Sequence, residues 1–329
     1  MKITVKDKRI LCELWNDSRS SSAQIAKKVG LSREVVDYRV KRLIKDKAIK
    51  RFVVSVDNEK IGFTTYMINI QLQEFNEQKL REIIGYFKAH RFVKWVASCS
   101  GKWDIIVVIA AKDKFHFDEL FSEISHNIYS SLKNYEILTR LSVMKDAAIS
   151  FIRKDSKELL PVRGFKHELS KPDNKDLLVL DELNKNPKAK IIDIASSVGI
   201  SVETVRQRIR NLEKSKIITS YRPMIDVNRL GYMMFMIFLE TNVIDKKKER
   251  ELRTLFSTLP NIHYVERYIG RYPLSIELVA RDNEEFHDVL VEVRNRLSQL
   301  IKSYELIVIL EQHKQESFPK GIIESLEKR

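Results

Sequence analysis

The chain has 329 residues, of which 43% are hydrophobic and 32% charged, with 9 Gly and 7 Pro. This composition excludes collagen-like and disordered chains, and no apolar run is long enough to span a membrane. The net charge is +14, and residues 1–62 and 171–231 together carry +12 of it, a pattern that favours binding to a polyanion. Since Cys12 and Cys99 cannot form a disulfide framework or a four-thiolate zinc site, we expect a reducing cytoplasm.

The first 62 residues show the pattern of a winged helix-turn-helix. Residues 6–16 place apolar side chains on one helical stripe, and a short second helix over 23–29 ends at Gly30. Ser32 caps a third helix whose Val36, Val40 and Leu43 face inward. The β-branched residues that follow, with a turn at Asp57, predict a β-ribbon wing.

Residues 63–150 predict a second kind of domain. A strand over 64–73, a helix over 77–89, two strands around Gly101, a helix over 114–132 and a strand over 135–143 give the order βαββαβ. This order is typical of a ferredoxin-like domain with both helices on one face of its sheet. The other face is apolar, so we expect two such sheets to pair, either within one chain or in a homodimer.

The sequence repeats itself without a gap at an offset of 169 residues. IAKKVGLSREVVDYRVKRL at 25–43 recurs as IASSVGISVETVRQRIRNL at 194–212, and Gly101 recurs as Gly270. One two-domain module is therefore duplicated and fused. We predict an α+β protein with winged helix-turn-helix domains at 1–62 and 173–231, ferredoxin-like domains at 63–150 and 232–316, and a linker at 151–172.

The third helix of each module is the element that can enter a major groove of double-stranded DNA. Its outer side chains can meet base edges, while flanking cations hold phosphates. The candidate DNA-binding residues are Ser32, Arg33, Glu34, Asp37, Tyr38, Arg39, Lys41 and Arg42 in the first copy, and Ser201, Val202, Glu203, Arg206, Gln207, Arg208 and Arg210 in the second. A winged helix that contacts only proteins is the alternative.

The motifs IAKKVGLSREVVDYRVKRLIKDKAI, VDNEKIG and GKWDIIV resemble the Lrp/AsnC (feast/famine) regulators over nearly the whole chain, twice. The resemblance implies a DNA-binding transcription regulator whose ferredoxin-like RAM domain binds a small effector, often an amino acid. It also implies an effector-binding Gly-x-x-Asp turn, which here comprises Gly101, Lys102, Trp103 and Asp104. The second copy keeps Gly270 but has Pro273 in place of the aspartate.

Enzyme motifs are absent from the sequence: it has no Gly-rich phosphate loop, nucleophile elbow or paired metal-ligand spacing. We therefore expect no catalytic residues, no metal and no cofactor. This double architecture also resembles that of the siroheme decarboxylases. A tetrapyrrole enzyme is therefore an alternative to the DNA-binding regulator. Their ribbon carries His and Arg, whereas KRFVVSVDNEKIGFTTYM in this chain has no His.

Overall fold

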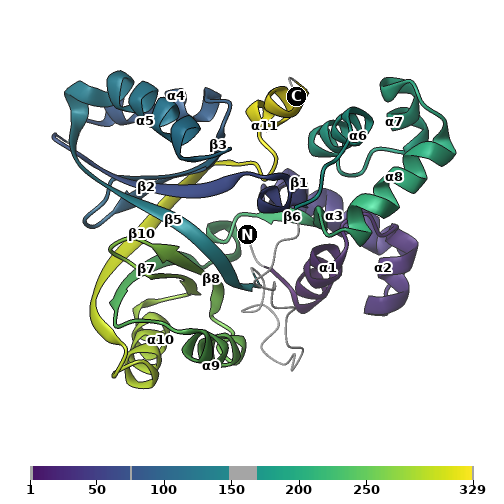
Figure 1. The fold of residues 1–329 in the computed structure, drawn as a ribbon. Coiled ribbons are helices and arrows are strands. Elements are labelled where there is room, and N and C mark those ends of the chain that lie inside the picture. The colour runs from purple at the N-terminus through teal and green to yellow at the C-terminus, as the bar shows by residue number, and fades with distance from the viewer. Residues whose placement is uncertain (1–2, 75, 148–168, 328–329) are drawn as a thin grey trace. The chain divides into compact units, whose positions relative to one another are not determined.

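The computed structural model describes residues 3–74, 76–147 and 169–327 (Figure 1). These residues form an α+β fold in two compact units, which we describe separately. The first unit draws on the described residues of Met1–Phe63, His167–Leu230 and Glu316–Arg329, and the second on those of Thr64–Lys166 and Gly231–Gln315. The predicted linker at 151–172 lies outside the described residues as far as position 168.

The first unit contains the two helix-turn-helix segments. Local sequence explains their boundaries: Thr4 and Asp7 form a capping box at the first helix, and Gly30 takes a φ of +67° after the second. Ser32 and Ser201 cap the third helices by accepting hydrogen bonds from backbone amides. The helices are α1 (Val5–Asn16), α2 (Ser22–Val29), α3 (Arg33–Lys45), α6 (Asn174–Lys185), α7 (Ile191–Val198) and α8 (Val202–Lys214).

The predicted ribbon inside each copy is wrong. Each copy contributes one strand, and β1 (Ile49–Val56) pairs antiparallel with β6 (Ile218–Ile225), which places Phe52 opposite Pro223. After β1 the chain enters a 3₁₀ turn, η1 (Asn58–Ile61), and in the second copy η4 (Asn228–Leu230) follows β6. Because a lone strand must satisfy its backbone groups, each strand takes its partner from the other copy.

A C-terminal helix, α11 (Lys320–Glu327), also belongs to the first unit and was not predicted. It packs on α6, and the chain leading to it is anchored by a hydrogen bond of 2.9 Å from Asn184 Nδ2 to the carbonyl of Phe318. The side chains of Phe318 and Ile322 are fully buried.

The second unit is a closed eight-stranded barrel in the order β10-β3-β4-β2-β5-β8-β9-β7. The predicted βαββαβ order is present twice. Figure 1 shows α4 and α5 on one side of the strands and α9 and α10 on the opposite side. The first-copy elements are β2 (Thr64–Leu72), α4 (Glu77–Ala89), β3 (Val93–Ser100), β4 (Ile105–Ala111), α5 (Lys114–Ile128), η2 (Tyr129–Ser131) and β5 (Leu132–Asp146). The second-copy elements are β7 (Met233–Thr241), α9 (Lys246–Ser257), β8 (Ile262–Ile269), β9 (Leu274–Ala280), α10 (Asn283–Arg296) and β10 (Ile301–Gln315).

The two sheets join within the chain, and they do so edge to edge. β5 and β10 each have 15 residues, far more than the 7 of β4. One end of β5 pairs with β2 in its own copy and the other end pairs with β8, while β10 pairs in the same way with β7 and β3. The long closing strands therefore leave no free edge in the barrel. None of the helices in the described part of the chain is long and apolar enough to cross a membrane.

Candidate nucleic-acid interface

The third helices α3 and α8 present polar and charged side chains to solvent. On α3, the side chain of Arg33 is 70% exposed, and Tyr38 and Lys41 are also exposed. On α8, Gln207 and Arg210 are exposed and Arg206 is 41% exposed. Val36 and Leu43 on α3, like Val205 and Leu212 on α8, point inward, so the predicted outer faces are the solvent faces.

Three of the candidate arginines hold the helices together instead of facing outward. Arg39 and Arg42 donate to the buried carboxylate of Asp7 at 2.9 and 2.7 Å. In the second copy, Arg208 donates to Asp173 at 2.8 Å and to Asp176 at 2.7 Å. The guanidinium groups of these three arginines therefore tie the third helix to the start of the first, and a contact of the same groups with DNA stays a prediction.

Replacing Asp7 by Ala is expected to lower the free energy of unfolding by roughly 2–3 kcal/mol, since it removes charge-assisted hydrogen bonds and a capping box. Burial opposes ionisation of Asp7, but hydrogen bonds from Thr4 and Arg39 and the charge of Arg42 hold its pKa below the ordinary 3.8. A lowered pKa means that this stabilisation is complete above about pH 4 and disappears as the pH falls through the folded-state pKa. Chemical denaturation at pH 7 and pH 3 measures both effects.

The matched control for this prediction is Asp176→Ala in the second copy. Arg208 keeps Asp173 as a second partner there, so we expect a smaller loss of stability than at Asp7. Equal losses of unfolding free energy at the two positions would contradict our interpretation that the ion pairs of Asp7 hold the third helix to the first.

The remaining contacts of the outer faces make the two copies unequal. On α8, Arg206 is ion-paired with Glu203, and Gln207 donates to Asn211 at 3.0 Å. On α3, Arg33 lies 3.7 Å from Asp37, a longer pairing, and Ser22 donates to the same Asp37 carboxylate. The first copy therefore offers the more available cation at the start of its third helix.

Lysines at and just after the ends of the third helices are not among the DNA-binding candidates predicted from the sequence. Lys47 and Lys216 occupy equivalent positions and adopt positive φ angles of 58° and 60° at the turn before β1 and β6. Both are exposed, as are the equivalent Lys45 and Lys214 at the helix ends. The repeat of lysine at the same two positions in both copies was the available signal.

The first-copy turn that the resemblance links to effector binding is occupied by contacts within the protein. Lys102 Nζ donates to Tyr272 Oη at 3.1 Å and to Glu305 Oε1 at 3.2 Å. Burial opposes its charge, but these hydrogen bonds raise the pKa of Lys102. Asp104 accepts a hydrogen bond of 2.7 Å from the backbone amide of Leu72, and Trp103 is 1% exposed.

The two glycines of these turns lie against the other copy. A Cβ on Gly101, whose φ is +130°, would lie 2.8 Å from the carbonyl oxygen of Leu306. A Cβ on Gly270, with φ of +139°, would lie 2.6 Å from Leu138 Cδ2. Both turns are therefore close-packed joints between the copies.

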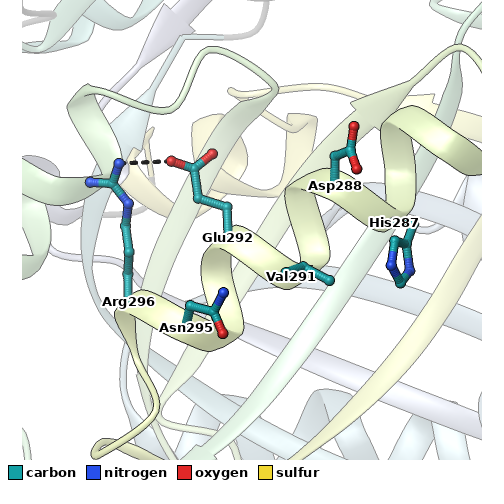
Figure 2. Close-up of a pocket in the computed structure, with 6 residues that line it drawn as sticks. All are labelled: His287, Asp288, Val291, Glu292, Asn295 and Arg296. Atoms are coloured by element: carbon teal, nitrogen blue, oxygen red, sulfur yellow. Dashed lines mark ion pairs between the residues drawn. The ribbon is translucent and has the colours of Figure 1, made fainter.

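A hollow of about 410 Å³ lies elsewhere, on the outer side of α10 (Figure 2). Arg296 and Glu292 form an ion pair of 2.7 Å there, and no predicted effector residue lines the hollow. Since every lining residue comes from one helix, no second element brings a converging group to this hollow. The lining residues are His287, Asp288, Val291, Glu292, Asn295 and Arg296. Within the described residues, no three His, Cys, Asp or Glu side chains cluster in a way that could hold a metal ion.

Comparisons with known proteins agree with two winged helix-turn-helix domains. A family model described as winged helix-turn-helix DNA-binding matches residues 3–50 and again 172–219. An uncharacterized HTH-type transcriptional regulator of Pyrococcus furiosus is 35% identical over 109 residues, which are 33% of this chain and 72% of the relative. The HTH-type transcriptional regulator LrpA of Pyrococcus horikoshii is 27% identical over 140 residues, 42% of this chain and 96% of LrpA.

These relatives correspond to one module each, since less than half of this chain covers nearly all of LrpA. The fold and the twofold match define a protein with duplicated winged helix-turn-helix domains. The chain belongs to the Lrp/AsnC family of HTH-type transcriptional regulators, as a tandem fusion of two modules.

Solved structures that cover nearly the whole chain include those of a tetrapyrrole enzyme. The siroheme decarboxylase NirDL superposes with a TM-score of 0.60 at 14% identity and covers 99% of this chain and 98% of its own. At that identity the likeness shows a shared fold alone.

Proposed function

We propose that this protein is a transcriptional regulator that recognises double-stranded DNA by sequence. The observation that carries the proposal is the exposed, polar third helix that both copies present within one unit. Arg39 and Arg208 fix each helix from behind, and the β1–β6 pair joins the two copies. This arrangement suits a two-part DNA site whose halves lie roughly one helical turn, or a multiple of it, apart.

The two kinds of side chain have different tasks in this proposal. Arg33 can donate to guanine, Glu34 can accept from cytosine, and Gln207 can pair with adenine. Lys45, Lys47, Lys214 and Lys216 are placed to neutralise phosphates and so to set the position of each helix. Since the same position of the third helix is Tyr38 in the first copy and Gln207 in the second, we expect the two half-sites to differ in sequence.

Modulation by a small effector such as an amino acid is a finer part of the proposal. It rests on the Gly-x-x-Asp turn, and the contacts of Lys102, Trp103 and Asp104 within the barrel mean that an effector would have to displace some of them. The names of the relatives support a transcriptional regulator. That it has no catalytic activity and acts in the cytoplasm is part of the proposal.

The test is selection of binding sites from a random duplex pool at about 0.15 M salt, followed by a salt titration on the selected site. We expect a pseudo-palindromic sequence with unequal halves. The logarithm of affinity should fall against the logarithm of salt concentration by about 0.9 per neutralised phosphate. No enriched sequence together with a flat salt response would refute direct recognition of DNA.

The two alternatives give other outcomes in cheap assays. A protein-interaction scaffold predicts weak retention on DNA with no dependence on sequence. A tetrapyrrole enzyme, which has the fold of NirDL in its favour, predicts a rise in Tm and a coloured complex when siroheme is added. Neither result is expected for the regulator.

A further inference from the structure

The two junctions that close the barrel are equivalent in backbone but different in chemistry. We call residues 64–147 the first half and residues 231–315 the second half. At the first junction β5 pairs with β8, and at the second β10 pairs with β3, with matching registers: Thr139 opposite Ile269 and Val308 opposite Ser100. Because the backbone pairing is the same at both junctions, only differences between their side chains can determine which two halves pair.

The β5–β8 junction contains a buried ion pair. Arg140 Nη1 donates to Glu266 Oε1 at 3.1 Å, and their side chains are 10% and 7% exposed. Tyr268 donates its hydroxyl to the other oxygen of the same carboxylate. Burial raises the pKa of Glu266, which the charge of Arg140 opposes, so the carboxylate depends on that guanidinium.

A second buried polar network joins β5 to α9 at the same junction. Glu249 is fully buried and binds Arg253 at 2.8 Å, while Ser142 of β5 donates to Glu249 at 3.2 Å. Arg253 also donates to the backbone carbonyl of Val143 at 2.9 Å. Arg267 of β8 also forms an ion pair with Glu249, so the first half adds hydrogen bonds to charged groups whose ion pairs lie within the second half.

The β10–β3 junction has no such charges at the equivalent positions. Arg140 corresponds to Ile309, and Glu266 corresponds to Ala97. On the helix, Glu249 and Arg253 correspond to Leu80 and Ile84. The side-chain contacts between β10 and β3 include Trp95 Nε1 to Gln312 Oε1 at 3.1 Å and His313 Nε2 to Ser98 Oγ at 2.9 Å.

One lysine contact is shared by both junctions and therefore cannot tell the halves apart. Lys145 Nζ donates to the carbonyl of Leu259 at 2.7 Å, and the equivalent Lys314 Nζ donates to the carbonyl of His90 at 2.9 Å. Each lysine binds the end of the first helix of the opposite half. These contacts strengthen pairing of any two halves.

We propose that the Arg140–Glu266 pair and the Glu249–Arg253 network are recognition determinants that make each half accept the other half of this chain as its partner and reject a second copy of itself. Pairing of two first halves would bury Arg140 against Ala97 and Cys99, with no carboxylate. Pairing of two second halves would leave the Glu266 carboxylate against Ile309. A buried charge that has lost its partner is strongly destabilising, so like halves are excluded.

The first experiment is a double-mutant cycle in the full chain. Arg140→Met and Glu266→Gln are each expected to lower Tm, because each leaves a buried polar group without its partner. The double variant should recover at least half of the larger single loss. Additive losses would mean that the pair is not coupled and would overturn the proposal.

The second experiment tests partner choice. Two full-length chains with different affinity tags, one carrying Arg140→Glu and the other Glu266→Arg, are co-expressed and analysed by native mass spectrometry. Exchange of halves restores the native pair in one barrel and the reversed pair in the other. We therefore expect a mixed dimer at least tenfold more abundant than with two tagged wild-type chains, which should stay monomeric.

The matched control is Lys102→Glu in one chain and Glu305→Lys in the other. This pair also joins the two halves, at 3.2 Å, but its side chains are 25% and 33% exposed, so solvent screens it. It should give no excess of mixed dimer. Charge-reversed chains that remain monomeric at the wild-type Tm, alone and together, would overturn the proposal. If neither charge-reversed chain can be purified, alone or co-expressed, the double-mutant cycle with Arg140→Met and Glu266→Gln decides whether the proposal holds.

Discussion

Replacing Arg33 and Lys41 together by Ala is expected to lower the affinity of the protein for its selected duplex about 100-fold. A specific base contact is worth ~1–3 kcal/mol, and a loss of ~1.4 kcal/mol is tenfold in affinity. Both side chains are exposed on α3, and neither ties the helices together as Arg39 and Arg42 do. The free energy of unfolding should therefore stay within about 0.5 kcal/mol of wild type. Fluorescence anisotropy with the selected duplex measures the affinity.

The comparison variant is Arg206→Ala with Arg210→Ala on α8. We expect a smaller loss of affinity for DNA from this variant, because Arg206 already forms an ion pair with Glu203. Lys79→Ala with Arg81→Ala on α4 removes a half-exposed and an exposed cation from the barrel unit and should leave the affinity for DNA within about twofold. Equal losses from α3 and α8 would refute the asymmetry between copies, and an equal loss from α4 would show that only net charge matters.

Gly101→Ala is expected to destabilise the barrel by roughly 3 kcal/mol or more. A non-glycine residue is strained at the φ of +130°, which costs ~1–3 kcal/mol, and the new Cβ would lie 2.8 Å from the Leu306 carbonyl oxygen. For a unit of this size we expect Tm to fall by roughly 6–12 °C. Differential scanning calorimetry measures the change directly.

The control is Gly85→Ala. Gly85 lies exposed inside α4 with no atom within 4 Å of its Cβ position, so alanine should raise stability by about 0.5–1 kcal/mol. A Gly101→Ala protein with wild-type Tm would show that the Gly101 turn is free to move. That result would favour an effector-binding role of the Gly101 turn over the close-packed contact between the two copies that we describe.

Local signals determined the helix-turn-helix segments. The hydroxyl of Ser32, the turn at Gly30 and the apolar spacing of Val36 and Leu43 act within a few residues of one another, so a reader of the sequence can use them. The βαββαβ order followed in the same way from strand alternation and helical periodicity. The duplication then required no structure, because the offset of 169 residues is constant along the chain.

Tertiary structure decided which groups meet. Nothing near β1 in the sequence shows that its partner is β6, because strand pairing depends on backbone groups that are common to every residue. For the same reason, the second part of β5 could not be assigned to β8. Its position on the third helix marked Arg39 as a candidate for DNA, and only the position of Asp7 in space showed that Arg39 also holds the helices together. The sequence alone thus determined the helix-turn-helix segments, the βαββαβ order and the family, whereas long-range contacts decided how the two copies pair and which cations remain exposed on the third helices.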